Sequence, residues 1–540
     1  MCAPWKLRSS SPDAIYERPL GLSELLFYLR GRACHGVSDS AHSVCFEVPN
    51  DSISLITEET VGKAWVFAKQ MHPLLGARVE TVGDRNEDVH FVVDEHRLKS
   101  HIPGEVTFMT VPSFSDADAT VENILNQERI LDDYHLVRLF VFRQSDQTNC
   151  FHIVFHAAHC VSDGVSRHIV VRTLLSFLSS LSHPVPAPPL SERLALSLAT
   201  DDLYPVRKLN IATQRWHRAM AQVIASIRSA KLISGGQSLP RKITVHMNEN
   251  PVDSRKTVLY FTAEETLCIL KICRDHGVTF GNVFAVLAQI AMGRLLCRRY
   301  AQGLITEEEW EFRKTEPTYT LGPVNIRPYL DHEWYTRGGA ENPMLSIGFY
   351  SYPMSFVPLK PEGAYAPFDI LLSRQRFWHR CRNMKKRAND LLKHPLFLDI
   401  GSVRYPRAIT MLKELESKVQ ASSSREEDLP ISAIDQAKHG MVFLFGGSNF
   451  GSADKLLPCE FPVGGETPTI YVRCSGLRLR CHPGEIYLGA STFRKELELV
   501  VYWDNNVTEK TIIEEWLREV KNATSYYLLE GGSGEDSALH

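Results

Sequence analysis

The stretch His156-Ala-Ala-His159-Cys-Val-Ser-Asp163-Gly164 is the most informative part of this 540-residue sequence. Before it, phenylalanine and isoleucine alternate with histidine and valine over 151–156, which predicts a strand with two different faces. After it, apolar residues recur at helical spacing over 163–181, which predicts a helix. His159 therefore lies in a strand-to-helix connection, from which its side chain can project into a cleft.

The residues around His159 suit general base chemistry. Either Ser162 or Asp163 can cap the following helix, and Asp163 can also fold back to brace the loop. Gly164 has no side chain and lets the chain turn closely. A neutral imidazole, with a pKa near about 6.5, can remove the proton of an alcohol while its oxygen attacks an acyl group. Attack on a thioester by this route requires neither a metal ion nor a serine nucleophile.

Strand and helix patterns continue on both sides of this stretch. Residues 137–143 and 151–156 are expected to form a hairpin around a polar turn. A Pro-rich segment follows at 183–190, and a second series of strands and helices begins near 254. The sequence therefore predicts an α/β fold of two halves with mixed sheets. Its parts are 1–182 with the histidine motif, 183–253 as a crossover linker, 254–530 as the second half, and 531–540 as a disordered tail.

Composition argues against several classes of function. Lys and Arg total 60 against 63 Asp and Glu, so no overall positive charge attracts nucleic acid or an anionic membrane. The 12 cysteines show no CxxC pattern, and 1–19 contains no apolar signal segment, so we expect a cytoplasmic protein. The most apolar stretch, 278–296, includes Asn282, Gln289 and Arg294. It predicts a core helix and no transmembrane segment.

Other kinds of site have weaker sequence support. His152, His156, His159 and Asp163 lack an accompanying HExxH, HxH or cysteine pair, so no metal is expected. The run 446–450 fails the GxSxG pattern at its last position, and no P-loop or GxGxxG pattern occurs. The basic run over 374–393 predicts a solvated helix face, with attraction of coenzyme A phosphates as the alternative.

The HxxxDG motif after an apolar strand resembles the histidine motif of the chloramphenicol-acetyltransferase-like superfamily. That superfamily includes plant BAHD acyltransferases, alcohol acetyltransferases and the condensation domains of peptide synthetases. The length and Arg18-Pro-Leu-Gly21 look most like its fungal trichothecene 15-O-acetyltransferase-like branch. Four further stretches resemble family segments in order and spacing: Gln70-Met-His-Pro-Leu-Leu-Gly-Ala-Arg78, Gly277-Val-Thr279, Gly322-Pro-Val-Asn325-Ile-Arg327 and Ser448-Asn449-Phe-Gly451.

The resemblance implies two chloramphenicol-acetyltransferase-like α/β sandwich halves with an active-site channel between them. It implies an acyl-CoA-dependent O-acyltransferase, with acetyl-CoA favoured, that acylates a hydroxyl of a small secondary metabolite such as a terpenoid. His159 would be the general base, with no covalent intermediate, and Arg327 would pair with Asp163, which fixes the loop. Ser448 and Asn449 are candidates for binding the oxyanion or the acyl donor. We therefore expect acyl-CoA as a co-substrate and no bound cofactor. We also expect a monomer that has no nucleic-acid partner.

The sequence departs from the family pattern at two places. Condensation domains usually have HHxxxDG, whereas Ala158 precedes His159 here. The DFGWG motif of plant enzymes is reduced to Asn449-Phe-Gly-Ser452. Both differences favour a free-standing enzyme that uses acyl-CoA. Two alternatives stay open: a condensation-type enzyme that takes its acyl group from a carrier protein, and a catalytically silent relative that binds a small molecule.

Overall fold

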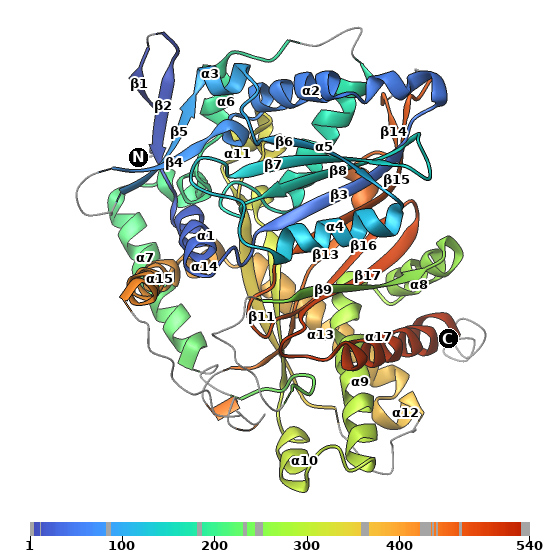
Figure 1. Ribbon diagram of the computed structural model, residues 1–540. Coiled ribbons are helices and arrows are strands. Elements are labelled where there is room, and N and C mark those ends of the chain that lie inside the picture. The colour runs from blue at the N-terminus through green and yellow to red at the C-terminus, as the bar shows by residue number, and fades with distance from the viewer. Residues whose placement is uncertain are drawn as a thin grey trace.

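Three β-sheets organise the protein in the computed structural model (Figure 1). The structure describes residues 5–10, 12–82, 88–180, 186–230, 235–242, 252–357, 367–421, 434, 437–438, 441–463 and 467–530. The predicted tail, 531–540, lies outside the described residues. The two large sheets each contain parallel and antiparallel pairs, and helices pack on them, which confirms the α/β class with mixed sheets.

The first large sheet carries the strand that leads to His159. Its strand order is β14-β15-β3-β8-β7-β6. β7 and β8 form the predicted antiparallel hairpin, whereas β6 runs parallel to β7. The strands are β3 (Ser40–Glu47), β6 (Val106–Val111), β7 (Val137–Gln144), β8 (Cys150–Ala157), β14 (Glu460–Phe461) and β15 (Ile470–Leu479).

Helices cover both faces of this sheet. α4 (Phe114–Asn126) packs on one face, against a cluster that includes Phe142 and Val154. α2 (Glu58–Met71) and α5 (Gly164–Ser179) pack on the other face, where Trp65 meets Phe155 with ring centroids 6.4 Å apart. β8 is therefore buried along its whole length. Because both faces of β8 are covered, its alternate positions hold His152, Val154 and His156 and not the exposed polar residues of a half-exposed strand.

A smaller four-stranded sheet lies beside the first large sheet. Its order is β1-β2-β5-β4, with all neighbours antiparallel. Its strands are β1 (Lys6–Ser9), β2 (Ile15–Pro19), β4 (Arg78–Val82) and β5 (Asp88–Asp94). The neighbouring helices are α1 (Leu22–Ala33) and α3 (Glu95–Lys99).

The second large sheet has the order β11-β10-β12-β16-β17-β9, with β13 paired to β16. Its core helix is α9 (Phe280–Ala301), the one helix among the described residues that is long and apolar enough to cross a membrane. Because 83% of its most apolar window is buried inside the protein, α9 is packed as a core helix. The strands are β9 (Ser254–Phe261), β10 (Thr318–Asn325), β11 (Ile347–Met354), β12 (Phe443–Gly446), β13 (Asn449–Ser452), β16 (Ile486–Phe493) and β17 (Glu496–Asp504).

The remaining helices follow the chain around this second sheet and its connection to the first. The predicted crossover contains α6 (Leu190–Leu196) and α7 (Ile211–Ala230). The others are α8 (Ala263–Asp275), α10 (Glu307–Arg313), α11 (His332–Thr336), α12 (Phe368–Leu371), α13 (Arg374–Leu392), α14 (Phe397–Ser402), α15 (Tyr405–Ala421) and α17 (Lys510–Thr524).

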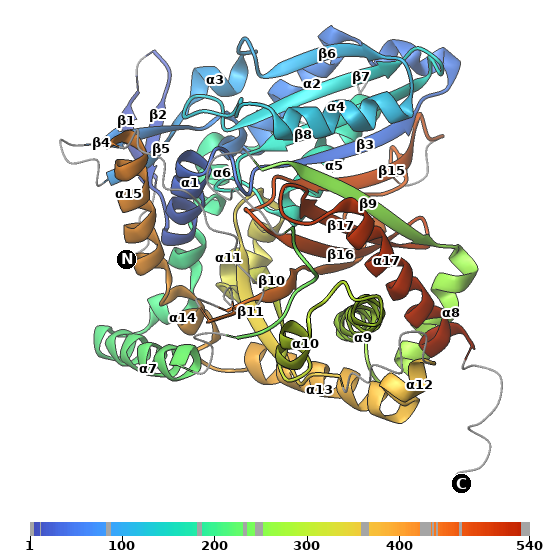
Figure 2. The ribbon, with the colours of Figure 1, turned by 60° about the horizontal axis from the view of Figure 1, so that its bottom comes forward.

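Two strands from the second half of the chain lie in the first large sheet. β15 pairs antiparallel with β3, and β14 pairs with β15 (Figures 1 and 2). The predicted second half, 254–530, therefore needs a correction, because its strands β14 and β15 lie in the sheet of the first half. A period-2 pattern predicts a strand but does not say which sheet edge the strand will join.

Candidate active site

His159 lies between β8, which ends at Ala157, and α5, which begins at Gly164. Its ring is half-buried and packs on Phe27 of α1, with ring centroids 4.5 Å apart. Nδ1 is enclosed by the loop and has no hydrogen-bond partner of good geometry among the described residues. The accessible edge of the imidazole is therefore the Nε2 edge.

The surroundings of His159 keep its imidazole neutral. Burial lowers the pKa of His159, and the positive charge of Arg167 lowers it further, whereas the negative charge of Asp163 acts in the opposite direction. The net result is a pKa well below the ordinary histidine value of about 6.5. At neutral pH the ring is therefore uncharged, which is the form that accepts a proton.

Asp163 caps α5 and is bound from several sides. The backbone N–H and the hydroxyl of Ser166 both donate to its Oδ1 at 2.9 Å, and the backbone N–H of Ser346 donates to its Oδ2 at 2.9 Å. Arg327 donates from Nη1 to Oδ2 at 2.9 Å and from Nη2 to Oδ1 at 3.1 Å. Among the described residues, none of these hydrogen bonds reaches His159. Asp163 thus braces the loop and has no direct proton path to the imidazole.

The Asp163–Arg327 ion pair joins the two halves of the chain. Arg327 follows β10, and its side chain is 2% exposed, against 1% for Asp163. Its Nη2 also donates to the carbonyl of Met344, in the connection before β11. Burial would raise the pKa of Asp163, but the charge and hydrogen bonds of Arg327 outweigh it, so the pKa is lowered. The structure thus brings together the first-half loop and the second-half arginine that the sequence analysis paired.

Gly164 is the contact point between the histidine motif and β13. A Cβ added to Gly164 would lie 2.4 Å from Cζ of Phe450, closer than carbon atoms approach. The Phe450 ring therefore packs directly on the first residue of α5. The two motifs, HxxxDG and Ser448-Asn449-Phe450-Gly451, are adjacent in space for this reason.

Ser448 and Asn449 lie at the start of β13, next to this contact. The Ser448 hydroxyl shares a hydrogen bond of 2.7 Å with the hydroxyl of Tyr487 in β16. Oδ1 of Asn449 accepts from the backbone N–H of Gly451 at 2.6 Å, which leaves its side-chain NH₂ for another acceptor. Burial raises the pKa of Tyr487 to about 12, so this phenol keeps its proton at neutral pH.

The sequence analysis did not single out Arg167 or Tyr487. Arg167 lies in the first turn of α5, is 4% exposed, and its Nε and Nη2 have no hydrogen-bond partner among the described residues. Its charge acts on both His159 and Tyr487, which links the imidazole electrostatically to the Ser448 hydrogen bond. An arginine four residues after the helix-capping aspartate was the available signal, since that spacing places both on one helix face.

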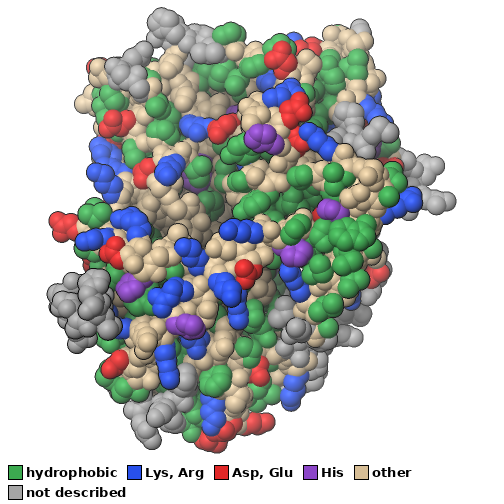
Figure 3. Space-filling view, turned by 180° about the vertical axis from the view of Figure 1, so that it is seen from behind, with side chains coloured by type: hydrophobic (Ala, Val, Ile, Leu, Met, Phe, Trp, Pro, Cys, Tyr) green, Lys and Arg blue, Asp and Glu red, His purple; other side chains and the backbone are tan. Residues whose placement is uncertain are grey.

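The basic run falls on α13, as predicted for a helix. Lys385 donates to the carbonyl of Gly277 at 2.7 Å, and Arg380 donates to the carbonyl of Ser355 at 2.6 Å, so part of this charge is used inside the second half. α13 lies along the lower edge of the molecule in Figure 2. Seen from behind, Lys and Arg side chains gather on the lower half of the surface (Figure 3). This charge has the sign that phosphate groups require.

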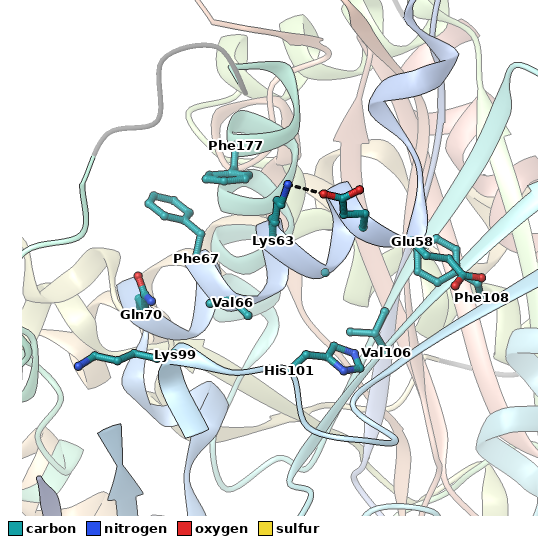
Figure 4. A pocket seen from close by; sticks show the side chains of 12 residues that line it. Glu58, Lys63, Val66, Phe67, Gln70, Lys99, His101, Val106, Phe108 and Phe177 are labelled. Atoms are coloured by element: carbon teal, nitrogen blue, oxygen red, sulfur yellow. Dashed lines mark hydrogen bonds and ion pairs between the residues drawn. The ribbon is translucent and has the colours of Figure 1, made fainter. Parts of the chain in front are cut away.

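One pocket lies away from these residues. It has a volume of about 750 Å³ and opens between α2, β6 and α5, where Phe67 and Phe177 stack with ring centroids 4.6 Å apart (Figure 4). No predicted site residue is among its lining residues. A cavity of about 40 Å³ lies among α9, β10 and β11. A Cβ added to Gly281 in its lining would lie 3.5 Å from Cβ of Asn449, so Asn449 is close to this cavity. The channel expected through His159 stays a prediction.

Comparison with known proteins identifies the fold. No family model matches the chain, and no curated protein sequence matches it. Among solved structures, TRI3 trichothecene 15-O-acetyltransferase from Fusarium sporotrichioides has 14% sequence identity and a TM-score of 0.69, and the match covers 98% of each chain. The condensation domain of the monacolin K polyketide synthase MokA has 11% identity and a TM-score of 0.56, with 95% of this chain and 98% of that chain covered.

The epimerization domain from the third module of tyrocidine synthetase B has 12% identity and a TM-score of 0.56, over 95% of this chain and 97% of that chain. Likeness at these identities shows the fold alone. The chain has the two-lobed chloramphenicol-acetyltransferase-like fold that these acetyltransferase, condensation and epimerization proteins share.

Proposed function

We propose that the chain is an acyl-CoA-dependent O-acyltransferase that transfers an acetyl group to a hydroxyl of a small secondary metabolite such as a terpenoid. The observation that carries this proposal is a half-buried, neutral His159 on a loop fixed by the buried Asp163–Arg327 ion pair. The similarity in fold to an O-acetyltransferase supports it. We expect a monomer that works in the cytoplasm with acyl-CoA as co-substrate and no bound cofactor.

The reaction begins with proton removal by His159. Because Nδ1 is enclosed, Nε2 takes the proton of the acceptor hydroxyl as its oxygen bonds to the thioester carbon. The tetrahedral intermediate collapses and breaks the carbon–sulfur bond. The departing thiolate receives the proton from the imidazolium, so the products are an ester and free coenzyme A. The imidazole returns to its neutral form without a covalent acyl-enzyme.

The negative oxygen of the intermediate needs hydrogen-bond donors. Only the side-chain oxygen of Asn449 is used in its turn with Gly451, so its side-chain NH₂ can donate to the oxyanion. The hydroxyl of Ser448 is oriented by its hydrogen bond with Tyr487. We assign the binding of the oxyanion or the thioester to these two residues. Asp163 exchanges no proton in this mechanism, because both its carboxylate oxygens are bound to Arg327 and backbone donors.

The test is incubation of the full chain with acetyl-CoA and a panel of hydroxylated terpenoids, followed by release of free thiol. The proposal predicts stoichiometric ester and thiol with at least one alcohol. A second arm presents the acetyl group on a phosphopantetheinylated carrier protein. Product in the carrier arm alone would establish the condensation-type alternative, and no product in either arm would favour a silent small-molecule-binding relative.

A further inference from the structure

A group of soft metal ligands lies on the face of the first large sheet that α4 covers (Figure 1). Cys45 in β3 is directly opposite His152 in β8 and directly opposite Cys474 in β15. Residues that oppose each other across antiparallel strands point to the same face, as do residues two apart on one strand. Cys150, two positions before His152, therefore joins the other three on this face.

The ligand atoms of Cys45, Cys150 and His152 all lie within 4.8 Å of one another. The sulfur atoms of Cys45 and Cys150 are 3.3 Å apart. The three residues are 4%, 3% and 3% exposed. Cys474 is half-buried and lies directly opposite Cys45, which extends the group to three thiols and one imidazole. This is the Cys₃His donor set of structural zinc sites.

The buried side-chain amide of Gln144 lies next to two of these ligands. Nε2 of Gln144 lies 3.2 Å from Sγ of Cys150 and 2.6 Å from Nε2 of His152. The amide nitrogen of Gln144 thus lies within hydrogen-bond distance of a sulfur and of an imidazole nitrogen, so the ligand atoms of Cys150 and His152 face one common point. Gln144 is 2% exposed and sits at the end of β7, where its amide can rotate away from that point.

The thiolate is the form of cysteine that binds metal ions. Zinc binding therefore displaces the S–H proton of each ligating cysteine, including the proton shared between Cys45 and Cys150.

We propose that Cys45, Cys150 and His152 bind a zinc ion, with Cys474 as the fourth ligand. Zinc binds sulfur at about 2.3 Å and nitrogen at about 2.0–2.1 Å in tetrahedral geometry. Ligand atoms of such a site are separated by about 3.3–3.8 Å. The ligand atoms of Cys45, Cys150 and His152 lie within 4.8 Å of one another, so these three side chains need to move only a little to bind the ion. Binding breaks the S–H bonds of the ligating cysteines, forms zinc–sulfur bonds and releases the protons to solvent. The zinc would fasten β15, from the second half of the chain, to β3 and β8.

The first experiment measures zinc in the full chain by inductively coupled plasma mass spectrometry after purification without chelators and dialysis with added zinc. About one zinc per chain is expected. The double variant C45S/C150S should lose it. The matched double variant C273S/C297S changes two buried cysteines of the second half and should keep it. Equal zinc in both double variants, or no stoichiometric zinc in the unsubstituted chain, would overturn the proposal.

Replacement of zinc by cobalt(II) then reports the ligands directly. The proposal predicts sulfur-to-cobalt charge-transfer bands and the strong visible bands of a tetrahedral site. H152Q should weaken the visible bands without removing the charge-transfer bands. A cobalt spectrum without thiolate bands contradicts the assignment. Because C45S/C150S can fold poorly, its melting temperature is compared with that of metal-stripped unsubstituted protein, and the two should agree within a few degrees.

Discussion

At the scale of single residues, the charge state of one imidazole decides whether the proposed chemistry is possible. His159 is neutral at physiological pH because burial and the Arg167 guanidinium both disfavour its protonated form. A base with a lowered pKa is weaker but is fully available at neutral pH. In the proposed mechanism Arg167 acts through the pKa of His159, and we class it as a positioning residue.

Replacing Arg167 with Gln tests this influence. Loss of the positive charge should raise the apparent pKa on the acid side of the kcat/KM profile by roughly one pH unit, because protonated His159 is no longer repelled. The unsubstituted enzyme should stay active well below pH 6.5, whereas R167Q should lose activity closer to it. The control is R172Q, on the same helix but paired with Glu341. A lower kcat with an unmoved profile would mean that Arg167 is only structural.

The sequence was sufficient to predict the individual residues of the histidine motif and the partner of Asp163. It did not reveal Arg167, because an arginine on a predicted helix normally lies in solvent. Nor did it reveal the proximity of Cys45, Cys150 and Cys474, which lie on three strands. Cross-strand register brings these residues together, and one sequence without a structure does not contain that information.

At the scale of elements, helix capping and ion pairing occur at one residue, Asp163, which lies next to the proposed catalytic loop. Asp163 is the N-cap of α5, and the same carboxylate receives Arg327 from the end of β10. Removing one member of a buried ion pair leaves the other charge without a counterion, which typically costs about 3–5 kcal/mol. The His159 loop is therefore held by the second half of the chain through this ion pair and through the backbone N–H of Ser346.

Asp163→Asn is therefore expected to lower the free energy of unfolding by about 3–5 kcal/mol and to reduce kcat. The acid-side pKa should move slightly down, because the negative charge of Asp163 raises the pKa of His159. Urea unfolding and a pH profile measure the two effects. The control is E59Q, which removes an exposed partner of Lys63 and should leave the urea unfolding midpoint nearly unchanged, because solvent screens that pair. A shift of several units in the kinetic pKa with unchanged stability would show that Asp163 tunes His159 directly.

Periodicity was sufficient to predict the hairpin of β7 and β8 and the helix α5, which lies within the expected 163–181. The pairing of β15 with β3 could not, because hydrophobic alternation is the same whichever sheet a strand joins. The pocket between α2, β6 and α5 could not be predicted from the sequence either, since its lining residues come from separate parts of the chain. Local signals thus predict elements, and long-range pairing decides their arrangement.

At the scale of the whole molecule, several buried histidines make stability depend on pH. Burial lowers the pKa of His72, His156 and His482 to about 3, and that of His152 and His168 to about 4. Their unfolded pKa is about 6.5, so below that pH the unfolded chain binds more protons than the folded chain. Their stabilisation is complete above about pH 6.5 and is lost as the pH falls.

We therefore expect the melting temperature to fall steadily from pH 6.5 to pH 5.5, with each histidine contributing up to about 1.4 kcal/mol per pH unit. Glu485, whose pKa is raised to about 7 by burial, acts in the opposite direction as a single group. Calorimetry at several pH values measures the effect. H156Q should reduce the number of protons taken up on unfolding. A melting temperature that is constant over this range would contradict the assigned pKa values.

The central claim is that His159 is the base for acyl transfer. The most direct measurement compares His159→Ala with the unsubstituted enzyme in acetyl transfer from acetyl-CoA to an accepted alcohol, with melting curves recorded for both. Loss of a general base predicts a fall in kcat of at least about a hundredfold, with an unchanged fold and acetyl-CoA still bound. Transfer at nearly the original rate by a folded H159A protein would contradict the account.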